Sequence, residues 1–222
     1  MSKKILAKVK KLNLKTIRFN LHYFPLKTAI KLPVFISANS KILSLKGKIS
    51  IQAPIKTGMI ELGYEHLGNF DKYNSRFIWD VRGEVIFERN ASIGHGCRIR
   101  VLETGQIYFG ENFVTTAETS FVSRKKISIG RNCLFSWEIL LMDTDFHNIT
   151  NEAGTVTNPD KEIIIGNNVW IGCRATVLKG AAIPDRCIVA AGSIVNRKLT
   201  GEQLIISGNP AAGIKPAGTW HL

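Results

Sequence analysis

Aliphatic residues recur every six positions through the second half of the 222-residue chain, and this period constrains the fold more than any other feature. The uninterrupted series is Ile165, Ile171, Val177, Ile183, Val189 and Val195. Four residues after each of the first five stands a smaller side chain, at Val169, Ala175, Ala181, Cys187 and Ser193. Positions six apart differ by about 240° on an α-helix, so a helix would scatter the series, whereas a strand bent at regular intervals keeps it on one side.

The same frame occurs earlier in the chain. It includes Phe87, Ile93 and Ile99, and again Ile129, Phe135 and Leu141. Glycine directly follows several of these aliphatics and asparagine lies nearby, at Gly94, Gly130, Gly166, Gly172, Asn132, Asn167 and Asn168. Because these residue types accept the backbone angles of tight bends, we expect three bent strands to close one triangular coil, and the coils to stack into an all-β parallel solenoid. Crossovers between parallel strands are right-handed in about 98% of folds, so the pattern by itself favours a right-handed coil.

The excess positive charge of the chain lies entirely in residues 1–60. This segment holds thirteen of the 30 Lys and Arg residues and no Asp or Glu, while the remaining seventeen balance the seventeen acidic residues. Lysines surround apolar residues at helical spacing between Ser2 and Leu14. This spacing predicts a short basic amphipathic helix, which either lies on an anionic membrane or packs on its own protein.

The chain divides into four regions on these patterns. Alternation from Val34 to Ile51 predicts strands within the basic region 1–60, and residues 61–86 hold the glycine and aromatic residues of short strands and turns. We expect the repeat solenoid over 87–200 and a tail over 201–222.

Composition and cysteine usage narrow the class of protein. No apolar run reaches the roughly 18 residues of a membrane span, and no signal peptide is recognisable, so we expect a cytoplasmic protein, with a peripheral position at the inner membrane leaflet as an option. The four cysteines show neither a C-x-x-C pair nor zinc-ligand spacing. We expect small buried residues and no metal.

The clearest stretch resembles a known family. IGNNVWIGCRATVLKGAAIPD over residues 165–185, VAAGSIV over 189–195 and GNPA over 208–211 resemble the hexapeptide-repeat acyltransferases, especially maltose/galactoside-type and capsule or exopolysaccharide O-acetyltransferases. The resemblance covers roughly Phe87 to Lys215. It implies a left-handed parallel β-helix, a homotrimer, acetyl-CoA as donor, and active sites in the clefts between subunits.

His147 is the catalytic base that the resemblance implies. It stands six residues after Leu141, where the next inward aliphatic was due, and the polar residues that follow predict a loop over 147–162 that leaves the solenoid. A histidine suits the role because the ordinary pKa of an imidazole, about 6.5, leaves it able to accept a proton near neutral pH. Asp145, Asp143, Glu162 or a backbone carbonyl remain alternatives for orienting the ring.

The resemblance also implies residues for the donor and the acceptor. The donor set is Ser136, Cys173, Ala191, Asn196 and Arg197. Trp170 faces outward in the repeat and lines the cleft or packs on the loop, while Lys215 takes part of the phosphate contact. Cys173 and Asn196 stand where relatives have serine and threonine. On the acceptor side, Thr116 replaces an asparagine that holds the sugar, and Trp137 stacks on a sugar face or covers the solenoid edge.

The sequence therefore predicts an O-acetyltransferase that acts on a hydroxyl of a polysaccharide or lipid-linked oligosaccharide. Alternatives are an N-acetyltransferase for an amino sugar, or a β-helix without this activity, such as a silent scaffold or a carbonic-anhydrase-like enzyme. The last needs several zinc-binding histidines, and in the repeat only His95 accompanies His147. Nucleic-acid binding is not expected, since the basic region lacks a base-reading module.

Overall fold

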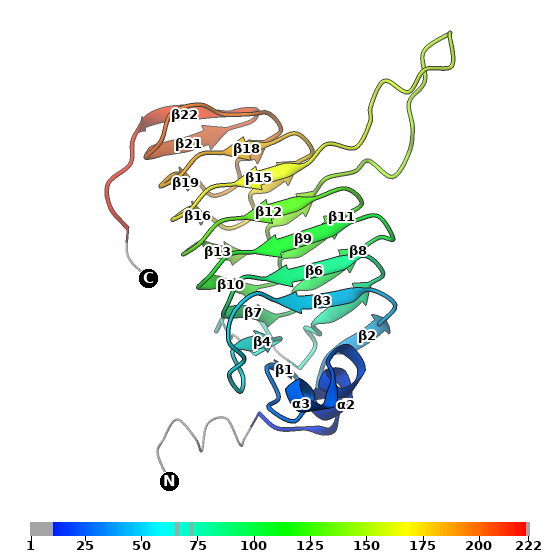
Figure 1. Cartoon of the computed structure of the whole chain (residues 1–222). Coiled ribbons are helices and arrows are strands. Elements are labelled where there is room, and N and C mark those ends of the chain that lie inside the picture. Colours follow the sequence, from blue (N-terminus) through cyan, green and yellow to red (C-terminus); the bar gives the residue numbers. More distant parts are fainter. Residues whose placement is uncertain (1–10, 65–66, 72, 221–222) are drawn as a thin grey trace.

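A computed structural model describes residues 11–64, 67–71 and 73–220. Its strands form three parallel sheets, visited in turn by the chain (Figure 1). Sheet A contains β1 (Val34–Ile36), β4 (Ile60–Leu62), β7 (Ala91–His95), β10 (Phe113–Ala117), β13 (Leu134–Trp137), β16 (Trp170–Ile171), β19 (Ile188–Val189), β21 (Leu204–Gly208) and β22 (Ala211–Pro216). Sheet B contains β2 (Lys41–Ser44), β5 (Ile78–Val81), β8 (Arg98–Val101), β11 (Ser120–Ser123), β14 (Leu140–Met142), β17 (Thr176–Leu178) and β20 (Ile194–Val195). Sheet C contains β3 (Lys48–Ile51), β6 (Glu84–Phe87), β9 (Gln106–Phe109), β12 (Ile127–Ile129), β15 (Ile163–Ile165) and β18 (Ala182–Ile183).

The six-residue repeat places one inward aliphatic on each sheet in turn. Ile165, Ile171 and Val177 lie on sheets C, A and B, and the next three members repeat that order. All six side chains, and the five smaller residues between them, are buried. The prediction of a parallel solenoid with a dry interior is confirmed, because every inward position of the repeat lies in one continuous core.

The interior changes character along the solenoid axis. Coils near the C-terminus advance 18 residues, as from Trp170 to its partner Ile188, and enclose Val, Ile and Ala. The first coils advance 26 or more residues, and the middle coils advance 22 between β7 and β10 and 20 between β10 and β13. Their wider interior holds buried phenylalanine rings, with Phe87 stacked on Phe109 at 5.2 Å and Phe113 edge-on to Phe135 at 5.0 Å.

Asparagine and glycine are found at the corners of the coils for two different reasons. Asn132 and Asn168 adopt positive φ angles of 54°, as expected for tight bends, and the Asn112 side chain donates to Asn132 Oδ1 at 2.9 Å in the next coil. Gly94 and Gly130 do not lie in that backbone region, so the predicted reason for them is wrong. A Cβ at Gly94 would lie 1.7 Å from the Thr116 carbonyl oxygen, so glycine is required there by the close approach of the neighbouring coil.

A helical cap covers the N-terminal end of the solenoid (Figure 1). It consists of α2 (Leu14–Tyr23) and the short α3 (Leu26–Ala29). Asn13 caps α2 by accepting from the Thr16 backbone N–H at 3.0 Å. The predicted helix from Ser2 to Leu14 lies mostly outside the described residues, and in its described part residues 11–13 are non-helical. Among the described residues, helical structure begins at Leu14, the last residue of the predicted helix.

The cap provides hydrogen-bond partners for backbone groups at the free edge of sheet A. The Asn20 side chain accepts from the Val34 backbone N–H at 3.1 Å and donates to the Val34 carbonyl at 2.7 Å, and the Thr16 hydroxyl does the same for Ile36 at 3.1 Å each. Phe19 packs against buried Trp79 with ring centroids 5.3 Å apart. These contacts occupy the edge strand β1, which would otherwise offer its backbone to another chain.

The sheets cross the predicted divisions of the chain. β1, β2 and β3 pair in parallel with β4, β5 and β6, so residues 34–86 form the first two coils of the same solenoid, and neither 60 nor 86 marks a break. The predicted tail from residue 201 contains the antiparallel hairpin of β21 and β22, which extends sheet A at the C-terminal end. No helix among the described residues is long and apolar enough to cross a membrane.

Three of the four cysteine side chains lie in the core. Cys97, Cys133 and Cys187 are buried and Cys173 is half-buried, all as free thiols. Burial raises the pKa of the Cys97 and Cys133 thiols to about 12, so these two side chains remain protonated.

Candidate functional site

The loop that carries His147 is an 18-residue insertion into one coil. Leu141 on β14 pairs with Val177 on β17, a separation of 36 residues, where neighbouring coils advance 18. Figure 1 shows the segment between β14 and β15 projecting far from the solenoid as an extended hairpin. A bridge between Thr150 and Val156 closes its tip. This segment includes residues 147–162, for which a loop outside the solenoid is predicted from the sequence.

Asp143 fixes the base of this loop to the preceding coil. Its buried carboxylate accepts from the Ser123 hydroxyl at 2.7 Å and from the backbone N–H groups of Arg124 and Lys125 at 2.7 and 3.0 Å. Because both carboxylate oxygens are engaged at this corner, the structure does not support Asp143 as the partner that orients the His147 ring. Its role is to hold the point where the chain leaves sheet B.

Asp145 and Asn158 hold the two arms of the loop together beside His147. The Asn158 amide donates to Asp145 Oδ2 at 2.8 Å and to the His147 carbonyl at 2.9 Å. Lys179 donates to the Asp145 carboxylate and to the Asn158 carbonyl, the latter at 2.6 Å. These bonds to Lys179 and Asn158 lower the pKa of the Asp145 carboxyl, which therefore stays ionised at neutral pH.

The His147 side chain is exposed at the base of the loop. In the described part of the chain, the contacts of Asp145 run to Lys179 and Asn158, so Asp145 positions the backbone around His147 rather than its ring. Neither Lys179 nor the role of Asn158 was predicted from the sequence. In the sequence, nothing distinguishes Lys179 from other residues that follow an outward position of the repeat. Only the folded corner brings Lys179 to the loop.

Phe146, which directly precedes His147, anchors the same segment on sheet B. It adopts a positive φ of 63°, and its ring lies 5.3 Å from the Arg100 guanidinium and 5.5 Å from that of Arg124. Stacking of two cations on one aromatic ring, together with the Asp143 bonds, gives the start of the loop a defined direction.

Several donor and acceptor candidates lie on the outer face of sheet A. The Trp170 indole N–H donates to the Ser136 hydroxyl at 3.2 Å, and its ring lies 6.3 Å from Trp220. Thr115 and Ala117 pair with Phe135 and Trp137, so Thr116 stands beside Ser136 in the adjoining strand. The Thr116 hydroxyl is buried and has no hydrogen-bond partner among the described residues.

The remaining donor candidates lie at the two ends of sheet B in the last coils. Cys173 and Ala191 are neighbours at the corner between sheets A and B, where the Gly192 backbone N–H donates to the Cys173 carbonyl at 2.9 Å. Asn196 and Arg197 are exposed just beyond β20, and Arg197 donates to the Ala211 carbonyl of β22 at 3.2 Å. Lys215 lies exposed further along β22.

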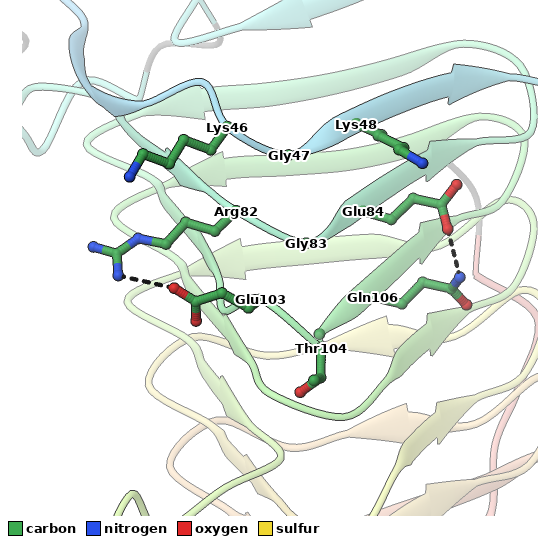
Figure 2. Close-up of a pocket in the computed structure, with 10 residues that line it drawn as sticks. Lys46, Gly47, Lys48, Arg82, Gly83, Glu84, Glu103, Thr104 and Gln106 are labelled. Atoms are coloured by element: carbon green, nitrogen blue, oxygen red, sulfur yellow. Dashed lines mark hydrogen bonds and ion pairs between the residues drawn. The ribbon is translucent and has the colours of Figure 1, made fainter.

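A basic pocket of about 460 Å³ lies under the loop, on the side of sheet C. Lys125, Lys161, Glu162, Ile164 and Lys198 contribute side chains to its lining. Lys198, in its lining, directly follows Arg197 in the chain. A different pocket, shown in Figure 2 between Lys46, Arg82 and Glu103, contains none of the predicted site residues.

The candidates do not all converge within one chain, although Asn196 and Arg197 lie at the corner from which the loop leaves. Thr116, Ser136 and Trp170 lie on sheet A, whereas the loop with His147 leaves from the far end of sheet B, at the corner between sheets B and C. In a triangular coil that corner is opposite sheet A. A site that uses both sets must therefore receive one of them from another copy of the chain.

Comparisons with known proteins agree with the fold. Residues 162–197 match the model of the bacterial transferase hexapeptide family (six repeats). An uncharacterized 24.8 kDa protein in the cps region of Klebsiella pneumoniae is 31% identical over 157 residues, which cover 70% of this chain and 69% of that protein. The galactoside O-acetyltransferase of Escherichia coli K12 is 26% identical over 167 residues, covering 72% of this chain and 76% of the relative.

Among solved structures, that of the polysialic-acid-specific acetyltransferase NeuO matches with a TM-score of 0.52, at 19% identity, over 85% of this chain and 79% of that one. This likeness concerns the fold, which is the left-handed parallel β-helix, opposite in hand to what the strand pattern by itself favours. The chain belongs to the bacterial hexapeptide-repeat transferases.

Proposed function

We propose that this protein is an O-acetyltransferase that transfers the acetyl group of acetyl-CoA to a sugar hydroxyl of a polysaccharide or a lipid-linked oligosaccharide. The observation that carries the proposal is the anchored loop, which presents an exposed histidine from a hexapeptide β-helix through Asp143, Asp145 and Asn158. Membership of the family, with a galactoside O-acetyltransferase and a capsule-region protein as relatives, supports both the reaction and the class of acceptor.

The chemistry requires one base and one stabilised oxyanion. An imidazole nitrogen of His147 takes the proton of the acceptor hydroxyl as the hydroxyl oxygen attacks the thioester carbonyl carbon. Backbone N–H groups on the neighbouring coils stabilise the tetrahedral oxyanion. The C–S bond then breaks, and the leaving thiolate receives the proton from His147, so that an acetyl ester and free coenzyme A are formed.

The donor fits the two ends of sheet B in the last coils. Half-buried Leu178 and Ile194 give an apolar outer surface between Cys173 and Arg197, suited to a pantetheine arm. The basic pocket beyond Arg197 supplies ammonium groups for the phosphates of coenzyme A. An amino-sugar acceptor, giving an amide instead of an ester, is the alternative that the same base and donor site would serve.

The decisive experiment is an acetyl-transfer assay. The protein is incubated with acetyl-CoA and a panel of bacterial oligosaccharides, both free and lipid-linked, while release of the thiol is followed. We expect acceptor-dependent thiol release and an alkali-labile acetyl ester on the sugar. An alkali-stable amide product would favour the alternative, and thiol release that no acceptor stimulates would contradict the proposed function.

Substitution of Arg197 tests the donor site. Because its guanidinium is proposed to contact phosphates rather than the reacting carbonyl, Arg197→Ala should raise the KM for acetyl-CoA roughly tenfold with a smaller change in kcat. Arg186→Ala is the matched control, since Arg186 is an exposed arginine at another corner of the same coils and pairs with Glu202. Equal KM values for Arg197→Ala and wild type would remove Arg197 from the donor site.

The separation of the two residue sets predicts an oligomer. We expect native mass spectrometry to give three times the mass of the chain, the state that the family resemblance implies. Mixing Trp170→Ala chains with His147→Ala chains and allowing exchange should restore part of the lost activity, because some clefts then receive both wild-type residues. A monomer with full activity would contradict the shared site.

A further inference from the structure

The N-terminal cap exposes an apolar surface. On α2, Leu14, Ile17 and Leu21 are spaced three and four residues apart, so they lie on one face of the helix, and their exposed fractions are 60, 38 and 53%. The opposite face is buried and includes polar Thr16 and Asn20, which bond to β1. The helix thus turns part of its apolar surface away from the protein.

The residues that follow enlarge this surface. Leu26 of α3 and Ile30 at its C-terminal end are both 68% exposed, and Leu12, before α2, is 46% exposed. We call Leu12, Leu14, Ile17, Leu21, Leu26 and Ile30 the cap patch. They are six of the twelve large apolar side chains that are exposed in the described part of the chain, although they fall within twenty residues. Such a concentration marks an interaction surface rather than scattered exposure.

Positive charge surrounds the cap patch. Residues 11–60 contain nine Lys or Arg and no acidic residue. Lys11 pairs with Glu61, and Lys15 donates to the carbonyls of Ala38 and Ser40, so these two are engaged within the protein. Arg18, Lys27, Lys31 and Lys41 are exposed on or beside the two helices. Figure 2 shows Lys46 and Lys48 on either side of Gly47 in the first coil, which extends the basic rim toward sheet C.

The positive charge of this rim indicates which partner can cover the cap patch. A second copy of the cap would bring the same cations together, and residues 1–10 would add four further lysines to the rim. Like charges oppose both arrangements. We propose that the cap patch inserts into the interfacial region of an anionic lipid membrane, with its apolar side chains at the acyl boundary and its Lys and Arg residues at the phosphate groups.

This arrangement gives the bound protein an orientation. The cap lies at one end of the solenoid and the loop with His147 projects from coils nearer the other end (Figure 1). Four strand spacings along sheet B separate β2 from β14, or about 19 Å at a spacing near 4.8 Å. If the proposed function holds, a sugar chain attached to a lipid would reach the loop only after several sugar units, which favours a lipid-linked oligosaccharide over a lipid-linked monosaccharide as acceptor.

The test is vesicle binding by the full chain without acetyl-CoA or acceptor, so its result does not depend on the proposed function. The probe is vesicles of phosphatidylcholine with one quarter phosphatidylglycerol, and vesicles of phosphatidylcholine alone serve for comparison. Wild type should bind the anionic vesicles, less so in high salt. Leu21→Ser/Leu26→Ser/Ile30→Ser should bind at least about tenfold more weakly, because three aliphatic side chains no longer enter the interface.

Two further variants test whether vesicle binding depends on the cap patch itself. Ile214→Ser changes a residue that is 62% exposed on β22, at the opposite end of the molecule, and should bind like wild type. Deleting residues 2–10 removes four lysines and keeps the cap patch, so this variant distinguishes the contribution of those lysines from that of the cap patch. The inference is wrong if the triple variant, folded by circular dichroism, binds as wild type does, or if it changes the native mass while vesicle binding stays constant, which would make the cap patch an interface between copies.

Discussion

Ile165→Asp should destabilise the protein by at least about 3 kcal/mol, whereas Ile164→Asp, one residue earlier on the same strand, should change stability by less than about 0.5 kcal/mol. Both residues belong to β15, but Ile165 points into the core with 2% of its surface exposed and Ile164 points outward with 44% exposed. In the first variant a carboxylate enters an aliphatic interior, while in the second it meets water. The identical substitution at neighbouring positions therefore isolates the effect of burial.

Urea unfolding followed by circular dichroism measures the difference, with both variants at one protein concentration because an oligomer's stability depends on it. If Ile165→Asp does not accumulate as folded protein, Ile165→Ala gives a measurable substitute, with an expected loss of about 2–4 kcal/mol. Comparable midpoints for the Ile165 and Ile164 variants would contradict the inward and outward assignment of the repeat.

The C-terminal coils could be predicted from the sequence because their period is unbroken. Each inward position from Ile165 to Val189 is followed by an outward residue and, four positions on, by a smaller buried one, so only one assignment of inward and outward positions fits. The first coils could not be delimited in the same way. Paired residues of neighbouring coils lie 26 residues apart between β1 and β4, 37 between β2 and β5 and 36 between β3 and β6, against 18 near the C-terminus, so the aliphatics leave the six-residue frame although these strands continue the same sheets.

The cap helix was missed for a different physical reason. Amphipathic analysis assigns the apolar face of a helix to the protein and the polar face to water. In α2 this relation is partly reversed, since Thr16 and Asn20 face the edge of β1 while Leu14, Ile17 and Leu21 face outward. The amphipathic pattern that predicts a helix from residue 2 to 14 therefore does not predict α2. The same reversal is what distinguishes the cap patch from an ordinary surface.

At the site, the sequence predicted the loop but not what holds it. His147 interrupts the inward series, so the pattern indicates that the chain leaves the repeat there, and the polar residues that follow favour a protruding loop. The roles of Asp143 and Lys179 depend on which corners the folded coils bring together, 18 and more residues apart. The site shared between copies, as proposed, would depend in addition on how two chains are placed, which no pattern within one chain specifies.

His147→Ala should lower kcat at least about a hundredfold and leave the affinity for coenzyme A unchanged. A sugar hydroxyl is a poor nucleophile near neutral pH, and a positioned base contributes roughly 10² to 10⁴ in rate. The loss should appear in kcat and kcat/KM alike, because the proton is transferred only in the transition state. Isothermal titration should give the wild-type Kd for coenzyme A, since the proposed donor contacts lie at Cys173, Ala191 and Arg197.

Two further variants distinguish the loss of a base from disturbance of the loop. His147→Gln keeps polar hydrogen-bonding atoms at this position but cannot accept the proton at neutral pH, so it should be as slow as His147→Ala. Asn148→Ala truncates the adjacent exposed side chain and leaves the bonds of Asp145 and Asn158 in place, so it should retain most of the activity. If His147→Gln acetylated the acceptor near the wild-type rate, His147 would not be the base. If Asn148→Ala were as slow as His147→Ala, the loop's position, rather than proton transfer by His147, would account for the loss.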